Sequence, residues 1–136
     1  MKPAVKTEAK SESKPATKHI LAVDDSESMR DVVSLTLKMA GYDATVATDG
    51  VNALAMAQKR HYDLVLTDIN MPHMNGIELI RALRALPGYK NTPILTLTTE
   101  RELPRRQEGK AAGATGWIVK PFLPDKLIAT LNKTLA

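Results

Sequence analysis

The chain has 136 residues, a net charge of +4 and no cysteine, with 43% apolar and 25% charged residues. This length and composition suit one soluble globular domain with a single hydrophobic core. The absence of cysteine excludes a disulfide framework and a thiolate metal site, and no apolar run approaches the roughly 18 residues that a membrane span needs.

Residues 1–17 consist mainly of Lys, Glu, Ser, Thr, Ala and Pro. Five lysines against two glutamates within residues 1–18 hold three of the four net positive charges. We expect a disordered basic tail, because this segment cannot bury enough apolar surface to offset the entropy of ordering. It lacks the apolar core of a signal peptide, so we expect a cytoplasmic protein. Since most of the positive charge lies in this tail, we expect neither nucleic-acid binding nor membrane insertion.

The next segment predicts a strand and an amphipathic helix. Residues 19–23 suit a short buried strand. Ser26 or Ser28 can cap the helix that follows, and Gly41 ends it. The apolar stripe of this helix comprises Met29, Val32, Val33, Thr36, Leu37 and Ala40. These positions recur at helical spacing, which predicts one buried face.

A second strand and a second helix follow in the same order. Residues 44–47 form a short apolar or β-branched run, and residues 49–59 predict an alanine-rich helix. Leu54 and Ala57 are the expected core contacts of that helix.

The third strand is expected over residues 64–67, which are too few for a helix. Asp68 follows it directly, and Met71-Pro72 stops the strand because proline lacks an N–H. Asn75-Gly76 predicts a turn and a helix cap. The apolar positions of the helix that follows are Leu79, Ile80, Leu83 and Leu86, and Pro87-Gly88 ends it.

Residues 93–98 and 116–119 predict the last two strands. The helix expected between them, over residues 102–112, is highly charged, contains Gly109 and commits few apolar side chains to a core. It is therefore predicted to be exposed and mobile. Pro124 suits the first turn of a final helix, whose apolar positions are Leu127, Ile128, Leu131 and Leu135.

Five strands thus alternate with five helices. The strands are continuous apolar runs, which is typical of a parallel sheet covered by helices on both faces. The sequence predicts an α/β fold.

Polar residues follow the strands where each one ends. These residues are Asp24 and Asp25, Asp68, Thr98, and Lys120 with Pro121. In a doubly wound sheet the carboxyl ends of the strands face one crevice. Each residue also has an ordinary structural explanation: a turn acid, a solvated acidic pair at a helix start, a strand-end hydroxyl or a surface lysine.

Taken together, these residue types indicate phosphoryl transfer. Three carboxylates repel one another unless a cation joins them, and their oxygens suit Mg²⁺. The hydroxyl of Thr98 and the ammonium of Lys120 can hold phosphoryl oxygens. A carboxylate nucleophile with these neighbours can form an aspartyl phosphate, and Asp68 is the candidate.

The sequence resembles a response-regulator receiver domain over about residues 18–136. The matching motifs are Val-Asp-Asp-Ser (23–26), Leu-Thr-Asp-Ile-Asn-Met-Pro-His-Met-Asn-Gly (66–76), Leu-Thr-Thr-Glu (97–100) and Gly-Ala-Thr-Gly-Trp-Ile-Val-Lys-Pro-Phe (113–122). No output domain follows in this sequence, so the resemblance is strongest to the stand-alone, CheY-like chemotaxis regulators. It implies a flavodoxin-like sheet in strand order 2-1-3-4-5.

The resemblance also implies residue roles. Asp68 is expected to be the phosphoacceptor, with Thr98 and Lys120 in contact with the phosphoryl oxygens. The implied Mg²⁺ ligands are Asp24, Asp25, Asp68 and the backbone carbonyl of Asn70. The Lys120–Pro121 bond is expected to be cis, a form found in about 5% of X–Pro bonds.

Further roles implied by the resemblance concern output and turnover. Asn70 and Glu100 are expected to tune dephosphorylation. Trp117 stands where the family usually has an aromatic switch that turns inward as Thr98 moves toward the phosphate. The alternative for Trp117 is a half-buried packing residue.

The implied phosphoryl donor is a CheA-like histidine kinase or a small acyl phosphate. The implied target is a flagellar motor switch protein or another output protein, with a phosphatase as a further partner. We expect a monomeric phosphoacceptor that assists its own phosphorylation and dephosphorylation and is not otherwise an enzyme.

Two other functions compete with this one. A phosphate sink or relay carrier would share the chemistry without a motor target. A phosphatase of the haloacid-dehalogenase type also forms an aspartyl phosphate, but it would need its nucleophile in an Asp-x-Asp motif after the first strand. A flavin site is disfavoured because the predicted crevice is acidic and no phosphate-binding loop follows the first strand.

Overall fold

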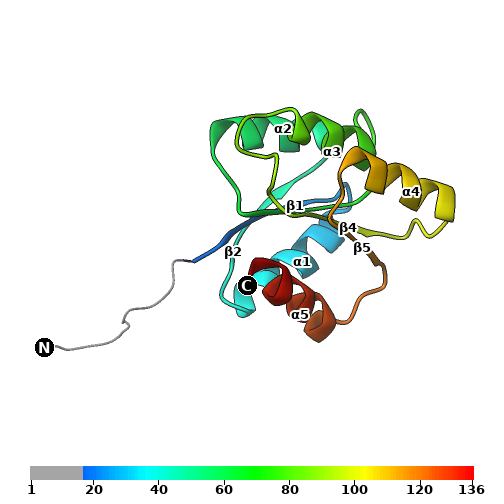
Figure 1. The fold of residues 1–136 in the computed structure, drawn as a ribbon. Helices are drawn as coiled ribbons and strands as arrows, with labels where there is room; N and C mark the ends of the chain where they lie inside the picture. The colour runs from blue at the N-terminus through cyan, green and yellow to red at the C-terminus, as the bar shows by residue number, and fades with distance from the viewer. Residues whose placement is uncertain (1–16) are drawn as a thin grey trace, which may run out of the picture.

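The computed structural model describes residues 17–136, so residues 1–16 of the predicted tail lie outside the described residues. The described chain forms a five-stranded parallel sheet in the order β2-β1-β3-β4-β5 (Figure 1). The strands are β1 (His19–Val23), β2 (Asp43–Ala47), β3 (Leu64–Thr67), β4 (Ile94–Thr98) and β5 (Gly116–Val119). The helices are α1 (Glu27–Met39), α2 (Gly50–Lys59), α3 (Gly76–Arg84), α4 (Leu103–Ala112) and α5 (Pro124–Leu135). The predicted α/β class and strand order are confirmed.

Helices cover both faces of the sheet, with α2, α3 and α4 on one side and α1 and α5 on the other (Figure 1). Successive strand residues point to opposite faces, so Leu21 packs toward α2 and α3 while Ile20 and Ala22 pack toward α1 and α5. A sheet that is covered on both faces favours apolar or β-branched residues at most strand positions, which explains the nearly continuous runs.

Helix ends follow local capping chemistry. Ser26 is the N-cap of α1, and its side chain accepts a hydrogen bond from the Met29 amide. Asn75 and Glu78 form a complete capping box at the start of α3. In contrast, the N-cap of α4 is Glu102, whose side chain makes no capping hydrogen bond.

Three sequence expectations differ in detail from the structure. Val32 is 50% exposed and Ala40 is exposed, so the buried face of α1 is narrower than its apolar stripe. The buried residues of α1 are Val33 and Leu37, which share one core cluster with Leu127 and Leu131 of α5. Leu86 lies beyond the end of α3, in the turn that follows the helix.

The prediction that α4 is exposed and places few side chains in the core is confirmed. Gly109 is its one buried residue, and Leu103 at its start is 62% exposed. The mobility of α4 stays a prediction. Within residues 17–136, no helix is both long enough and apolar enough to span a membrane.

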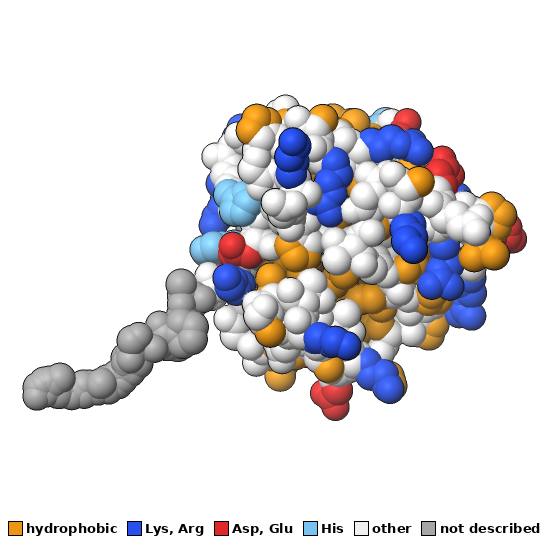
Figure 2. Space-filling model, viewed as in Figure 1, with side chains coloured by type: hydrophobic (Ala, Val, Ile, Leu, Met, Phe, Trp, Pro, Cys, Tyr) orange, Lys and Arg blue, Asp and Glu red, His pale blue; other side chains and the backbone are white. Residues whose placement is uncertain are grey.

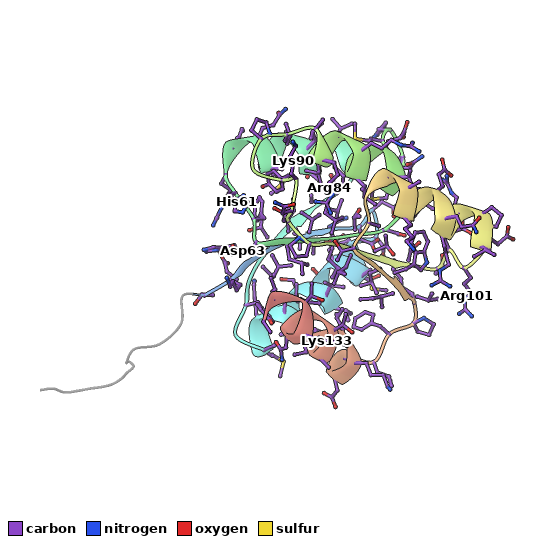
Figure 3. The ribbon with its side chains drawn as sticks, in the orientation of Figure 1. His61, Asp63, Arg84, Lys90, Arg101 and Lys133 are labelled. Atoms are coloured by element: carbon purple, nitrogen blue, oxygen red, sulfur yellow. The ribbon has the colours of Figure 1, made fainter. Side chains whose placement is uncertain are left out.

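The side chain of Arg84 ties together two loops that lie far apart in the sequence. Its guanidinium donates hydrogen bonds to the carbonyls of Tyr89 at 2.6 Å and Thr92 at 2.7 Å in the α3–β4 loop. It also donates twice to the carbonyl of Gly113, after α4. Figure 3 shows Arg84 beside Lys90, whose carbonyl accepts a further bond at 3.3 Å. Arg84 therefore links the end of α3 to the start of β5.

Replacing Arg84 by Met is expected to lower the free energy of unfolding by about 2–3 kcal/mol, because several carbonyls lose their donor while the apolar stem is kept. Urea unfolding followed by the fluorescence of Trp117 measures the change. Arg81→Met is the matched control: Arg81 is more exposed, one turn earlier, and its loss should cost less than about 0.5 kcal/mol. Equal effects of the two substitutions would contradict a linking role for Arg84.

Candidate phosphoryl-transfer site

The carboxyl ends of four strands bring the predicted site residues together. Asp24 directly follows β1, Asp68 follows β3 and Lys120 follows β5. Thr98 is the last residue of β4 and is fully buried. The parallel register places Val23 beside Thr67 and Thr98 beside Val119, so the residues that follow emerge at one edge of the sheet.

Three carboxylates form an acidic cluster at this edge. One oxygen each from Asp24, Asp25 and Asp68 lies within 4.8 Å of the others. Asp24 and Asp68 are buried, at 6% and 8% exposure, whereas Asp25 is exposed. Like charges at this spacing repel strongly when they are buried, so this cluster needs a positive charge nearby.

Lys120 supplies that charge within the described chain. Its Nζ lies 2.6 Å from Oδ2 of Asp24 and 3.3 Å from Oδ2 of Asp68. Burial by itself lowers the pKa of Lys120. The hydrogen bond to Asp24 and the charges of both carboxylates outweigh burial, so the pKa is raised above its usual 10.5. The lysine therefore stays charged and bridges the two buried acids.

The backbone around Asp68 holds its side chain in a defined orientation. Oδ1 accepts a hydrogen bond from the amide of Ile69 at 2.7 Å, while Oδ2 faces Lys120. The Asp68 carbonyl is approached so closely by Gly76 that a Cβ there would lie 2.1 Å from the carbonyl oxygen. Glycine is thus required at position 76 for α3 to start against the end of β3.

The donor set fits a magnesium ion. Mg²⁺ favours carboxylate and carbonyl oxygens and keeps several water ligands, and the exposed Asp25 leaves room for water on the open side. Asn70 lies in the exposed loop after β3, so its carbonyl as a further ligand stays a prediction. The Lys120–Pro121 bond is cis, as expected.

A short chain of hydrogen bonds leads from Thr98 to Trp117. The Thr98 hydroxyl accepts from the amide of Glu100 at 3.2 Å. The carbonyl of Glu100 accepts from Nε1 of Trp117 at 2.9 Å. Trp117 is half-buried, as its packing alternative requires, but its indole N–H also holds the β4–α4 loop. Whether the ring turns on phosphorylation stays a prediction.

Gly109 makes room for this ring. A Cβ at Gly109 would lie 2.6 Å from Cζ3 of Trp117, which is too close for any real contact. From the sequence alone, Gly109 was only a residue that lowers the helix propensity of its segment. Because this contact is too short, we expect a larger residue at position 109 to push the indole away from the Glu100 carbonyl.

Gly109→Ala is therefore expected to shift the emission of Trp117, the one tryptophan of the chain, to longer wavelength. Alanine favours a helix over glycine by about 1 kcal/mol, whereas overpacking costs about 1–3 kcal/mol. We expect net destabilisation by about 1 kcal/mol, measured by urea unfolding. Ala111→Gly, at an exposed position of α4, measures the propensity difference alone. Stabilisation by Gly109→Ala with unchanged emission would show that the ring does not depend on Gly109.

Some residues around the site were not anticipated from the sequence. Arg30 donates from Nη1 to the backbone carbonyl of Asp24 at 2.8 Å. Arg101 donates to the carbonyl of Lys120 at 3.3 Å, and Figure 3 shows it at the edge of the molecule near the start of α4. Arginine on a charged helix or loop is ordinary, so residue type and spacing carry no sign of either contact.

Comparisons with known proteins agree with this geometry. The family model for the response regulator receiver domain matches residues 20–132. Chemotaxis protein CheY-3 of Vibrio cholerae serotype O1 is 42% identical over 115 residues, which cover 84% of this chain and 88% of CheY-3. The structure of the chemotaxis response regulator CheY4 of Vibrio cholerae has a TM-score of 0.84 at 52% identity, covering 88% of this chain and 100% of CheY4.

A further similar structure contains a metal ion. The receiver domain of a sensor histidine kinase from Pseudomonas aeruginosa PAO1 has a TM-score of 0.82 at 29% identity, covering 88% of this chain and 98% of that domain. It holds a magnesium ion coordinated in its active site cleft. Each of these comparisons spans more than four fifths of the present chain.

Proposed function

The chain belongs to the response regulator receiver domain family of two-component signalling, and from this premise we propose that it is a chemotaxis-type regulator phosphorylated on Asp68. The observation that carries the proposal is the buried Asp68 carboxylate bridged by Lys120 to Asp24, with Asp25 beside them. The similarity to CheY-3 and CheY4 supports the chemotaxis type.

The proposed reaction moves one phosphoryl group to the protein. A carboxylate oxygen of Asp68 attacks phosphorus, the bond to the donor's imidazole nitrogen or acyl oxygen breaks, and an acyl phosphate forms. The ammonium of Lys120 and the hydroxyl of Thr98 are proposed to bind the phosphoryl oxygens. Lys120 is already buried and held beside Asp68, so it needs little reorganisation as negative charge develops. Thr98 is buried at the end of β4 and is proposed to move toward the phosphoryl group.

Receiver domains typically use Mg²⁺, and Asp24, Asp25 and Asp68 are the proposed ligands here, together with the carbonyl of Asn70. When bound, the ion would neutralise charge on the acidic cluster and on the phosphoryl oxygens. The residues themselves position the attacking carboxylate and exclude water from its inner side. Glu100 and Asn70, on the loops that flank the site, are proposed to influence the lifetime of the aspartyl phosphate.

The proposed output surface is the face formed by α4, β5 and α5. A groove on this face is lined by Leu103, Arg106, Lys110 and Trp117, among others. Figure 2 shows several Lys and Arg side chains near the start of α4. The hydrogen bonds from Thr98 through Glu100 to Trp117 would carry a change at the phosphate to this groove. The proposed target is a flagellar motor switch protein, and the proposed phosphoryl donor is a CheA-like kinase. A phosphatase is proposed as a further partner. The acting form is proposed to be a cytoplasmic monomer.

Incubation with acetyl phosphate and Mg²⁺, followed by intact mass measurement, tests this function. We expect the mass of one added phosphoryl group, and no addition when EDTA removes the metal. Beryllofluoride with Mg²⁺ should change Trp117 fluorescence in parallel. The absence of both the adduct and the fluorescence change would contradict the proposal.

A further inference from the structure

The amide, the carbonyl and both carboxylate oxygens of Asp24 all take part in hydrogen bonds. Its amide donates to the carbonyl of Ala47 at 3.1 Å, and Oδ1 accepts from the amide of Ser26 at 2.9 Å. Oδ2 accepts from Lys120, and the backbone carbonyl accepts from Arg30. The bond from the Asp24 amide fixes the chain before this residue, and the bond to Oδ2 holds the carboxylate against Lys120. The bond from the Ser26 amide closes the turn around Asp25. The bond from Arg30 is the one that holds the carbonyl of the Asp24–Asp25 peptide itself.

That peptide unit joins Asp24 to Asp25. The carbonyl of Asp24 and the amide of Asp25 lie in one plane, so holding the carbonyl also sets the direction in which Asp25 leaves the loop. Within residues 17–136, the Asp25 carboxylate accepts no hydrogen bond of its own, and Asp25 is exposed. Its position relative to the other acids therefore depends on the backbone rather than on side-chain contacts.

Arg30 is well placed to hold this peptide. It lies in the first turns of α1, where its own amide donates to the carbonyl of Ser26 at 2.9 Å. Its side chain is half-buried and turns back to the loop that precedes the helix. A guanidinium that bonds a carbonyl from a regular helix forms a rigid brace, because the helix backbone cannot move independently.

We propose that Arg30 is a positioning residue that sets the metal-binding geometry of Asp25 by bracing the Asp24–Asp25 peptide. The inference rests on the proposed function, since it concerns the same metal site. Within residues 17–136, Arg30 makes no hydrogen bond to Asp68 or to the carboxylate oxygens of the proposed ligands; its bond at the site goes to the backbone carbonyl of Asp24. Residues that orient metal ligands typically change metal affinity by about 10–100-fold when they are replaced.

The positive charge of Arg30 and its proposed positioning role predict opposite effects of its removal on metal affinity. Arg30 brings a positive charge near a cation site, so its removal should tighten metal binding if charge dominates. If positioning dominates, removal should weaken binding because Asp25 is no longer held. We expect Arg30→Met to weaken Mn²⁺ binding by roughly tenfold, and Arg30→Lys, which keeps one donor, to lie between Met and the wild type.

The experiment measures free Mn²⁺ by its electron paramagnetic resonance signal in titrations of the full chain without a phosphoryl donor. Lys38→Met is the matched control, because it removes one positive charge from the exposed end of the same helix. Thermal unfolding midpoints of all variants report whether the fold is kept. A second readout is the Mg²⁺ dependence of phosphorylation by acetyl phosphate, where Arg30→Met should need more Mg²⁺ but reach the wild-type rate at saturation.

The outcomes separate this inference from the proposed function. Weaker Mn²⁺ binding by folded Arg30→Met, with Lys38→Met unchanged, supports the brace. Equal or tighter binding by Arg30→Met overturns it while the proposed function stands. Failure of the wild type to bind Mn²⁺ at all overturns both. A lower phosphorylation rate at saturating Mg²⁺ would overturn the positioning role, because Arg30 would then act on the reaction itself.

Discussion

The Asp68→Asn variant is expected to accept no phosphoryl group from acetyl phosphate or from a histidine kinase. The substitution keeps an oxygen that can accept from the Ile69 amide and changes the side-chain volume little. It removes the nucleophilic carboxylate, and a neutral amide cannot form the acyl phosphate. Intact mass measurement in the presence of Mg²⁺ should therefore show the unmodified chain alone.

Asp68→Asn should lose phosphorylation without unfolding. Lys120 keeps its closer partner, Asp24, at 2.6 Å, and one of three clustered negative charges disappears. We expect the unfolding free energy to change by about 1 kcal/mol or less, equivalent to roughly 4 °C in the midpoint. Asp63→Asn, at the opposite end of the same strand (Figure 3), is the control and should be phosphorylated like the wild type. An adduct on Asp68→Asn would place the phosphoacceptor elsewhere.

The Lys120→Met variant is expected to have the largest effect on stability among substitutions at the site. Removing one partner from a buried ion pair typically costs about 3–5 kcal/mol, and here two buried carboxylates are left facing each other. Mg²⁺ should recover part of this loss by binding the same carboxylates. Urea unfolding with and without Mg²⁺ measures both effects. A variant as stable as the wild type in EDTA would show that the bridge contributes nothing.

The stability difference between Lys120→Met and the wild type should also depend on pH. The pKa of Lys120 is raised in the folded chain, so its ammonium stabilises the fold fully below the unfolded value of 10.5. This stabilisation is lost as the pH rises through the folded pKa. We therefore expect a constant difference between about pH 7 and 9 that shrinks above about pH 10.5. A difference that stays unchanged at higher pH would contradict a charged bridge.

Lys120→Met should in addition separate phosphorylation from output. Asp68 would still be phosphorylated, but the phosphoryl oxygens would lack the contact with Lys120 that is proposed to produce the change at Trp117. Trp117 fluorescence of the phosphorylated variant is then expected to stay at its unphosphorylated value. A fluorescence change equal to that of the wild type would show that Lys120 is not needed for the signal.

Much of the fold could be predicted because a parallel sheet leaves a strong pattern. All five strands lie within one residue of their predicted positions, since each is a short run of mostly apolar or β-branched residues that ends at a polar residue or a turn. The same rule predicted that Asp24, Asp68 and Lys120 would lie at one edge of the sheet, because parallel strands end together. The strand order, which the resemblance implied, places these residues near one another.

Helix surfaces were less predictable than strands. The stripe on α1 included Val32 because its spacing is helical, yet Val32 is half exposed. Periodicity shows which residues share a face but not how far the neighbouring helix extends over that face. Gly109 gives a second example. The sequence showed only its low helix propensity, whereas the structure shows that the absence of a side chain leaves space for the ring of Trp117.

The sequence by itself therefore determined the α/β class, the strand positions and the chemistry of the strand ends, because these follow from local residue patterns and from the rule that parallel strands end together. Only the tertiary structure decided which atoms meet: Lys120 against Asp24, Trp117 against Glu100 and Gly109, Arg30 against the Asp24 carbonyl, and Arg84 between two loops. Each of these contacts depends on side-chain direction and on how helices lie against the sheet. Those quantities are set by the packing of the whole core, which no short stretch of sequence contains.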